Sequence, residues 1–238
     1  MGKPVRLDKY LSAYTELSRK DAKKAIRSGR VLVGHQTVFF EDSKVTDEEE
    51  VWLDGEPVQA EPYVYYMMNK PSGVLSATKD ARDKTVLDLI ETSKRTVFPV
   101  GRLDKDTEGL LLLTDNGELS HILLSPRYHV DKVYEICYDG ELKPDAVADF
   151  ERGIDIGEKH LTKPARLELL GEGKARLTIS EGKFHQVKRM IAKEGGRVTY
   201  LKRIAMAGIV LDGALGPGEY RRLTENEIEI LKKSGRKE

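Results

Sequence analysis

The sequence predicts an α+β fold whose main sheet is mixed and mainly antiparallel. Strand-like segments outnumber helical ones along the 238 residues, and tight glycine-containing turns join many of them. Both features favour this class over a doubly wound parallel sheet. An acidic run ends at Glu61, and Pro62 cannot join a central strand ladder. We therefore expect a small N-terminal module in residues 1–60 and a larger domain in residues 61–238.

The N-terminal module reads as two helices and a small sheet. Leu7, Tyr10 and Leu11 have the i, i+3, i+4 spacing of a first helix. A second helix is indicated by Ser18, which can act as its N-cap, and by Gly29, which is placed to end it. Residues 30–34 and 51–53 follow as strands.

The second helix carries a stripe of cations. Arg19, Lys23 and Arg27 recur every four residues and therefore share one face. Residues 1–40 hold nine Lys or Arg against three Asp or Glu, whereas residues 41–61 hold one against nine, although the net charge of the chain is zero. A local cluster of cations favours nucleic-acid binding, and a solvated helix face is the alternative.

In the larger domain, alternation and turn signals predict the elements in order. The expected strands include residues 63–68, 132–138, 165–170 and 174–180. The expected helices are residues 117–124, 144–152, 184–194 and 225–233.

The helix predicted at residues 184–194 has one apolar stripe, made of Phe184, Val187, Met190 and Ile191. Lys188 lies at the edge of this stripe, so we expect it to point inward and to pair with a carboxylate, which it would keep ionised. Arg189 lies on the opposite side with Lys193, where it suits contact with phosphate.

A charged loop, residues 101–109 (Gly-Arg-Leu-Asp-Lys-Asp-Thr-Glu-Gly), lies between two apolar segments, 97–100 and 110–113. Carboxylates at the mouth of a core are costly unless they are paired or used. One of the three acids is therefore a candidate working group, and a solvated turn is the alternative.

Several function classes are excluded by what the sequence lacks. It has no dinucleotide or phosphate-loop motif, no zinc-protease motif and no nucleophile elbow, and its five histidines are scattered. The single cysteine, Cys137, gives no disulfide framework. No apolar run approaches the roughly 20 residues that span a bilayer. We expect a cytoplasmic protein that needs neither a metal nor another cofactor and has no membrane partner.

Several spaced motifs resemble known families. Residues 6–10, 18–19 and 29–31 resemble the S4 RNA-binding domain. Residues 101–110 resemble the catalytic motif of the RNA pseudouridine synthases of the ribosomal small-subunit type. The resemblance extends over essentially the whole chain, through residues 69–73, 125–127, 132–134, 161–165, 181–190 and 217–220. Segments 161–165 and 185–190 are most similar to members that act on 16S rRNA.

The resemblance implies a reaction and a set of roles. Such an enzyme isomerises a uridine to pseudouridine, at position 516 of 16S rRNA in the members with these segments. It implies Asp104 as catalytic nucleophile, Lys188 as the cation paired with it and Tyr134 as the side chain that stacks on uracil. Arg102 would take the place of the displaced base or hold a phosphate, and Leu201 would form an apolar wall.

The expected partner is therefore ribosomal RNA, 16S rather than 23S, as free RNA or within an assembling small subunit, bound by a monomer. Two alternatives remain open. One is the same chemistry on 23S rRNA, and the other is a non-catalytic rRNA-binding assembly factor. A pure binding protein, however, has no need of Asp104, Tyr134 and Lys188 together.

Overall fold

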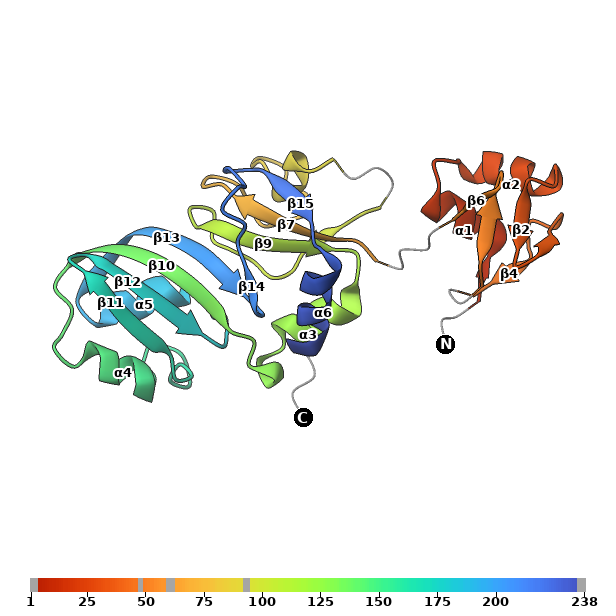
Figure 1. Ribbon diagram of the computed structural model, residues 1–238. Helices are drawn as coiled ribbons and strands as arrows, with labels where there is room; N and C mark the ends of the chain where they lie inside the picture. The colour runs from red at the N-terminus through yellow and green to blue at the C-terminus, as the bar shows by residue number, and fades with distance from the viewer. Residues whose placement is uncertain (1–3, 47–48, 59–62, 92–94, 235–238) are drawn as a thin grey trace. The chain divides into compact units, whose positions relative to one another are not determined.

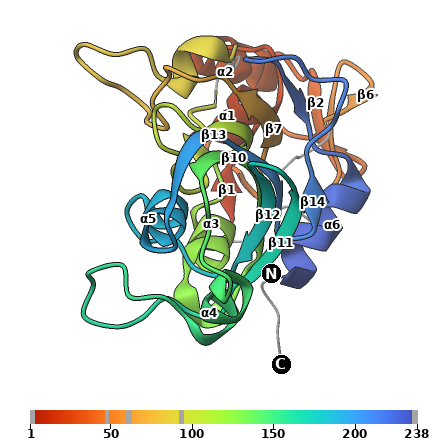
Figure 2. The ribbon, with the colours of Figure 1, turned by 90° about the vertical axis from the view of Figure 1, so that its left-hand side faces the viewer.

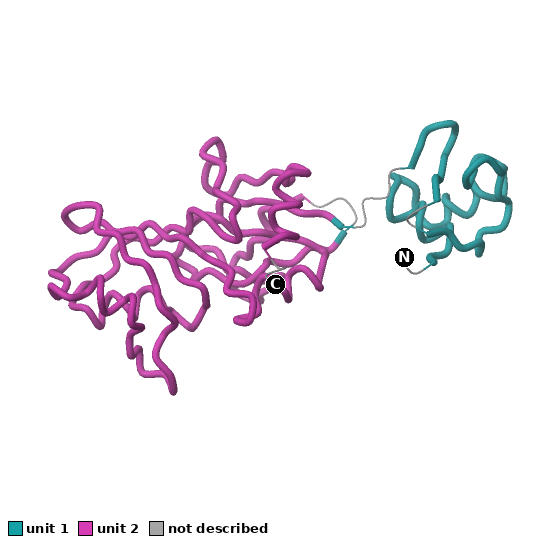
Figure 3. Tube along the Cα trace, turned by 60° about the horizontal axis from the view of Figure 1, so that its bottom comes forward, with its two compact units in different colours: residues 1–63, 93–95 teal, residues 64–92, 96–238 magenta. Residues whose placement is uncertain are grey.

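The computed structural model describes residues 4–46, 49–58, 63–91 and 95–234. It forms two compact units, one of residues 1–63 and 93–95 and the other of residues 64–92 and 96–238 (Figure 3). The predicted boundary at residues 61–62 lies outside the described residues. Within the described ranges, no helix combines the length and the apolar character needed to cross a membrane.

The first unit is a pair of helices packed on two small sheets. Strands β3, β2, β5 and β6 form one antiparallel sheet in that order, and β1 pairs with β4 in the other. The elements are β1 (Val5–Arg6), α1 (Leu7–Tyr14), α2 (Arg19–Arg27), β2 (Val31–Val33), β3 (Gln36–Thr37), β4 (Lys44–Val45), β5 (Val51–Leu53) and β6 (Glu56–Pro57).

The two helices form as their sequence predicts. Leu7, Leu11 and Ile26 are completely buried between them and the sheets. The hydroxyl of Ser18 accepts a hydrogen bond from the Asp21 amide and caps α2. Gly29 follows the helix with a φ of +72°, a conformation that glycine adopts without steric cost.

The second unit is built on a nine-stranded sheet (Figure 1). Its elements are β7 (Tyr65–Lys70), η1 (Val86–Leu89), β8 (Phe98–Pro99), β9 (Glu108–Thr114), α3 (Gly117–Leu124), η2 (Pro126–Tyr128), β10 (Lys132–Gly140), α4 (Ala146–Arg152), β11 (Arg166–Gly171), β12 (Lys174–Ile179), α5 (Gln186–Lys193), β13 (Gly196–Met206), β14 (Ile209–Val210), β15 (Tyr220–Arg222) and α6 (Glu225–Ser234).

The sheet order is β11-β12-β10-β13-β9-β7-β15, with β14 paired to β13 and β8 paired to β9. Among the named strands of the described residues, β9 and β13 form the one parallel pair in this sheet, and the other pairs are antiparallel. The predicted α+β class with a mainly antiparallel mixed sheet is confirmed.

Helices cover both faces of this sheet, which explains the continuous apolar run at residues 110–113 in β9. Leu111 and Leu113 face the core that holds α4 and α5, whereas Leu110 and Leu112 face the core that holds α3 and α6. A strand with a core on each side needs apolar residues at every position. Figures 1 and 2 show α5 beside β13, and Figure 1 shows α3 beside α6.

Among the predicted elements whose ends differ, two lie next to the site described below. The strand expected at residues 63–68 runs from Tyr65 to Lys70, because its last residues pair with β9 instead of forming a turn. The helix expected from Phe184 begins at Gln186, because His185 has a left-handed φ of +47°. Phe184 is consequently outside the helix and 74% exposed, and its placement in the buried stripe was wrong.

Candidate active site

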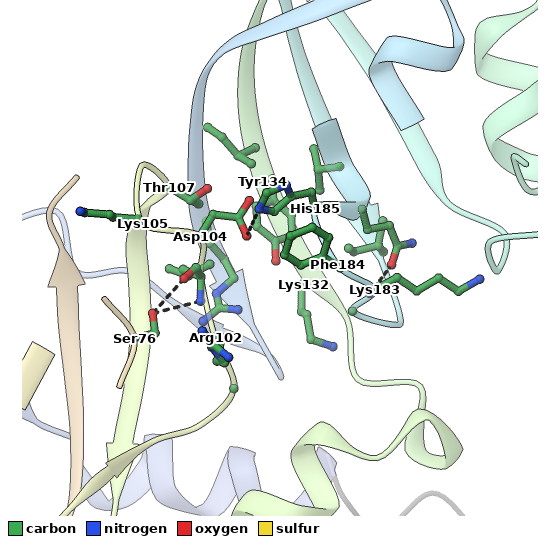
Figure 4. Close-up of a pocket in the computed structure, with 18 of the residues that line it drawn as sticks. Ser76, Arg102, Asp104, Lys105, Thr107, Lys132, Tyr134, Lys183, Phe184 and His185 are labelled. Carbon is green, nitrogen blue, oxygen red and sulfur yellow. Dashed lines mark hydrogen bonds and ion pairs between the residues drawn. The ribbon is translucent and has the colours of Figure 1, made fainter. Parts of the chain in front are cut away.

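A cleft of about 510 Å³ opens in the second unit beside the loop that precedes β9 (Figure 4). Arg102 and Asp104 line it from this loop, Tyr134 lines it from β10, and Leu201 lines it from β13. Four of the residues predicted from sequence are thus brought together around one space.

Hydrogen bonds fix the backbone on both sides of Asp104. The Ser76 hydroxyl accepts a hydrogen bond from the Leu103 amide and donates one to the Leu103 carbonyl, both at 3.1 Å. After Asp104 the chain turns, and the Thr107 amide donates to the Asp104 carbonyl at 3.1 Å. The carboxylate is therefore carried by a loop of defined shape.

Lys70, at the end of β7, holds the second half of the same loop. Its ammonium is buried and donates to the carbonyls of Thr107 at 2.8 Å, Pro71 at 3.0 Å and Lys105 at 3.2 Å. Burial lowers the pKa of Lys70 to about 8. Sequence reasoning missed this role, although residues 69–71 belong to a segment that resembles the family.

Gly109 allows the loop to enter the sheet. It has a φ of +99° and lies opposite Arg203 in the parallel pair of β9 and β13. A Cβ atom at this position would lie 2.2 Å from the Arg203 carbonyl oxygen. Only glycine fits both the backbone conformation and this close approach.

Lys188 contacts Asp104, in the arrangement expected from the helix. Its Nζ lies 3.3 Å from Oδ2 of Asp104 and 2.6 Å from Oδ1 of Asp106. Burial lowers the pKa of Lys188, but the hydrogen bond to Asp106 and the charge of Asp104 outweigh it and raise that pKa above its ordinary value. The site therefore keeps a cation between two carboxylates.

Asp106 also belongs to this cluster of charges, a role that the sequence alone did not predict. The turn after Asp104 brings its carboxylate back toward α5, and the hydrogen bond from Lys188 holds the pKa of Asp106 below its usual range. His185 was also missed. Its Nε2 lies 3.7 Å from Oδ1 of Asp104, and its place in a family-like motif was the available signal.

Tyr134 and Leu201 form neighbouring parts of the cleft wall. They lie on the paired strands β10 and β13, and each is less than one-tenth exposed. Both side chains also belong to the hydrophobic core of the unit. Arg102 is exposed at the cleft, and within the described part of the chain it has no ion-pair partner.

Arg189 is not placed as predicted. Its guanidinium donates to the carbonyl of Ile156, to the carbonyl of Phe184 at 3.1 Å and to the carboxylate of Glu158 at 2.8 Å. The loop before β11 folds over this side of α5, and the helical wheel could not show that. Arg189 is therefore an internal connection and is not presented to phosphate.

The predicted cationic stripe of α2 exists, but acids from other elements meet it. Arg19 and Lys23 lie 3.4 and 3.8 Å from the buried carboxylate of Asp8, and Arg27 lies 2.7 Å from Glu41. Burial raises the pKa of Asp8, but Arg6 and Arg19 outweigh this effect and hold it below its usual range. Asp8 and Glu41 lie outside α2, so the charge pattern of the helix alone did not reveal them as partners of its cations.

Comparison with known proteins decides the family. The model of the RNA pseudouridylate synthase family matches residues 64–193, and the S4 domain model matches residues 5–51. The chain belongs to the RNA pseudouridine synthase family. It is an enzyme that converts uridine in RNA to pseudouridine, and it carries an N-terminal S4 RNA-binding domain.

Relatives match almost end to end. The chain is 46% identical to the uncharacterized RNA pseudouridine synthase YtzG of Bacillus subtilis, over 95% of this chain and 98% of that protein. It is 43% identical to ribosomal small subunit pseudouridine synthase A of Escherichia coli, over 94% and 98%. A crystal structure of a pseudouridylate synthase, 39% identical, superposes with a TM-score of 0.68 over 95% of this chain and 99% of that one.

Proposed function

We propose that this enzyme isomerises one uridine of 16S rRNA, at position 516, with Asp104 as the catalytic nucleophile. The observation that carries the proposal is the carboxylate of Asp104 in a cleft, with Lys188 3.3 Å away and Tyr134 on the cleft wall. The name of the Escherichia coli relative, which refers to the small ribosomal subunit, supports the choice of RNA.

The reaction rearranges bonds without an oxidant or reductant. The N1–C1′ bond of the uridine breaks, the uracil turns, and a C5–C1′ bond forms. The proton on C5 is lost and N1 gains one, so substrate and product are isomers. Asp104 can assist by attack on the sugar or the base, or by removal of a ribose proton. A base in a stacked helix cannot turn, so the uridine must first leave the stack.

The remaining residues have roles that suit their positions. Lys188 balances the negative charge of Asp104. Tyr134 stacks on the uracil, and Leu201 forms an apolar wall of the cleft against the base. Arg102, exposed beside the cleft, occupies the place of the displaced base or holds a phosphate. We assign residues 1–60 to RNA binding and residues 61–238 to catalysis, in a monomer that acts in the cytoplasm without a cofactor.

Replacement of Asp104 by Asn tests the assignment. We expect Asp104→Asn to abolish pseudouridine formation in a 16S rRNA transcript and to leave RNA affinity nearly unchanged, because the amide keeps the shape but not the nucleophile. Asp139→Asn is the matched control, since Asp139 is an exposed carboxylate at the far end of β10. Pseudouridine at undiminished levels with Asp104→Asn would refute the role.

The RNA target is tested by the same assay with different substrates. Pseudouridine should be mapped in 16S and 23S transcripts, and in an assembling small subunit. Modification confined to 23S rRNA would overturn the choice of RNA but not the chemistry. Binding of 16S rRNA with no modification of any RNA would favour an assembly factor.

A further inference from the structure

Phe184 is a large apolar side chain left in solvent beside the active site. It is 74% exposed, the highest value among the large apolar side chains described in the second unit. Its ring stacks on the imidazole of His185, with centroids 3.8 Å apart and planes at 20°. Exposed aromatic rings that are already stacked on one face are suited to accept a further flat group on the other.

Local hydrogen bonds fix the backbone on both sides of this ring. The Phe184 carbonyl accepts from Arg189, whose guanidinium also bonds to Ile156 and Glu158. On the other side, the Lys183 amide donates to the Gln186 side chain at 2.8 Å. Arg189 was predicted to bind phosphate, but its hydrogen bonds instead shape the segment that presents Phe184.

The position of the ring relates it to the reaction. His185, against which it stacks, lies 3.7 Å from Asp104, and Phe184 and His185 both line the cleft (Figure 4). Tyr134 and Leu201 are buried deeper in the same cleft wall. Phe184 is therefore outside the place proposed for the uracil itself, but within reach of what adjoins it.

We propose that Phe184 is a stacking platform for the base of a nucleotide next to the target uridine. When the uridine leaves the stack, its neighbours lose a stacking partner, and unpaired RNA bases bind well to exposed aromatic rings. The exposed side chain of Arg102 lines the same cleft and suits a phosphate beside that base. This inference rests on the proposed function, because it requires a flipped uridine near Asp104.

Fluorescence can test the contact without relying on catalysis. A short RNA with 2-aminopurine at one nucleotide on either side of the target should lose fluorescence at one of the two positions when wild-type enzyme binds. Phe184→Ala should remove this quenching, whereas Phe184→Trp and Phe184→Tyr should keep it. Quenching that is identical with Phe184→Ala would overturn the proposal.

An abasic substrate provides the second test, through a double-mutant cycle. Removing the stacked base should lower kcat/KM of the wild type about 5- to 100-fold, as expected for one base–aromatic contact. The same lesion should cost Phe184→Ala nothing further. Independent, multiplicative losses at both flanking positions would contradict the contact.

Two control variants separate stacking from other effects. Phe184→Leu keeps an apolar side chain but no ring, so it should behave as Phe184→Ala. Leu169→Ala changes an exposed apolar residue of β11 outside the cleft and should behave as wild type. If wild-type enzyme modified no RNA while Phe184-dependent quenching persisted, the proposed function would fail and the stacking contact would stand.

Discussion

At the scale of single residues, the site depends on how charges are paired around Asp104. Lys188 serves two carboxylates, and it lies closer to Asp106 than to Asp104. An ion pair in a partly enclosed cleft is less screened than one at the surface, so the loss of its cation is costly.

Variants of Lys188 and Asp106 should differ strongly. We expect Lys188→Met to lower the single-turnover rate about 10- to 1000-fold, as for loss of one electrostatic group at a reacting centre. Lys188→Arg should recover part of that rate. Asp106→Asn should change the rate less than about threefold, because Lys188 stays beside Asp104. An equally large loss with Asp106→Asn would show that the two carboxylates act as a unit.

At the scale of elements, the end of β7 fixes the loop that carries Asp104. The strand predicted at residues 63–68 stops before Asn69 and Lys70, yet both belong to β7 because they pair with β9, about 40 positions away. This pairing carries the Lys70 ammonium beneath the loop, where three carbonyls replace its water. The segment 69–71 therefore holds the backbone of the loop that carries Asp104.

We expect the free energy of unfolding to depend on pH through the buried ammonium of Lys70. The pKa of Lys70 falls from an ordinary value of 10.5 to about 8 in the folded chain, so between these values the unfolded chain binds more protons. Stability from this group therefore rises as pH increases through that window.

Comparison with Lys70→Met isolates the effect. This variant leaves three carbonyls without a donor and should be less stable at pH 7 by about 1–3 kcal/mol. Denaturant unfolding of both proteins between pH 7 and pH 10 should show the advantage of the wild type growing with pH. A constant difference would mean that Lys70 does not titrate there.

At the scale of the whole molecule, a net charge of zero conceals an uneven distribution. The cations of the first forty residues gather on α2, and Glu41, the first residue of the acidic segment, pairs with Lys23 and Arg27. Part of that acidic segment therefore neutralises cations of α2. The sequence alone did not explain why the segment is acidic. The three cations of the stripe outnumber Asp8 and Glu41, and we propose that their excess charge contacts RNA.

The salt dependence of RNA binding should measure this stripe. Replacing Arg19, Lys23 and Arg27 together by Gln should weaken binding and reduce the slope of log affinity against log salt by about 1–2. The full value for three phosphates is about 2–3, and Asp8 and Glu41 already offset part of the charge. The matched control replaces Arg152, Arg166 and Arg197, which are exposed, acid-paired cations of the second unit. An identical slope for wild type and α2 variant would make the stripe a solvated face.

The sequence by itself determined the local features of this protein. The cap at Ser18, the stop at Gly29, the strand alternation and the fold class follow from interactions among residues a few positions apart, and these need no knowledge of the rest of the chain. The motif around Asp104 indicated the family for a similar reason, since it is contiguous.

Only the tertiary structure decided which side chains meet. Lys188 and Asp106 are 82 positions apart, and the loop that covers Arg189 comes from before β11. A helical wheel gives the direction of a side chain but not what packs against it, so it placed Lys188 correctly and Arg189 incorrectly. Phe184 lies before the first residue of α5, where the wheel does not apply. Long-range packing determines which side chains become partners, because the path of a loop decides which charged groups and rings come into contact.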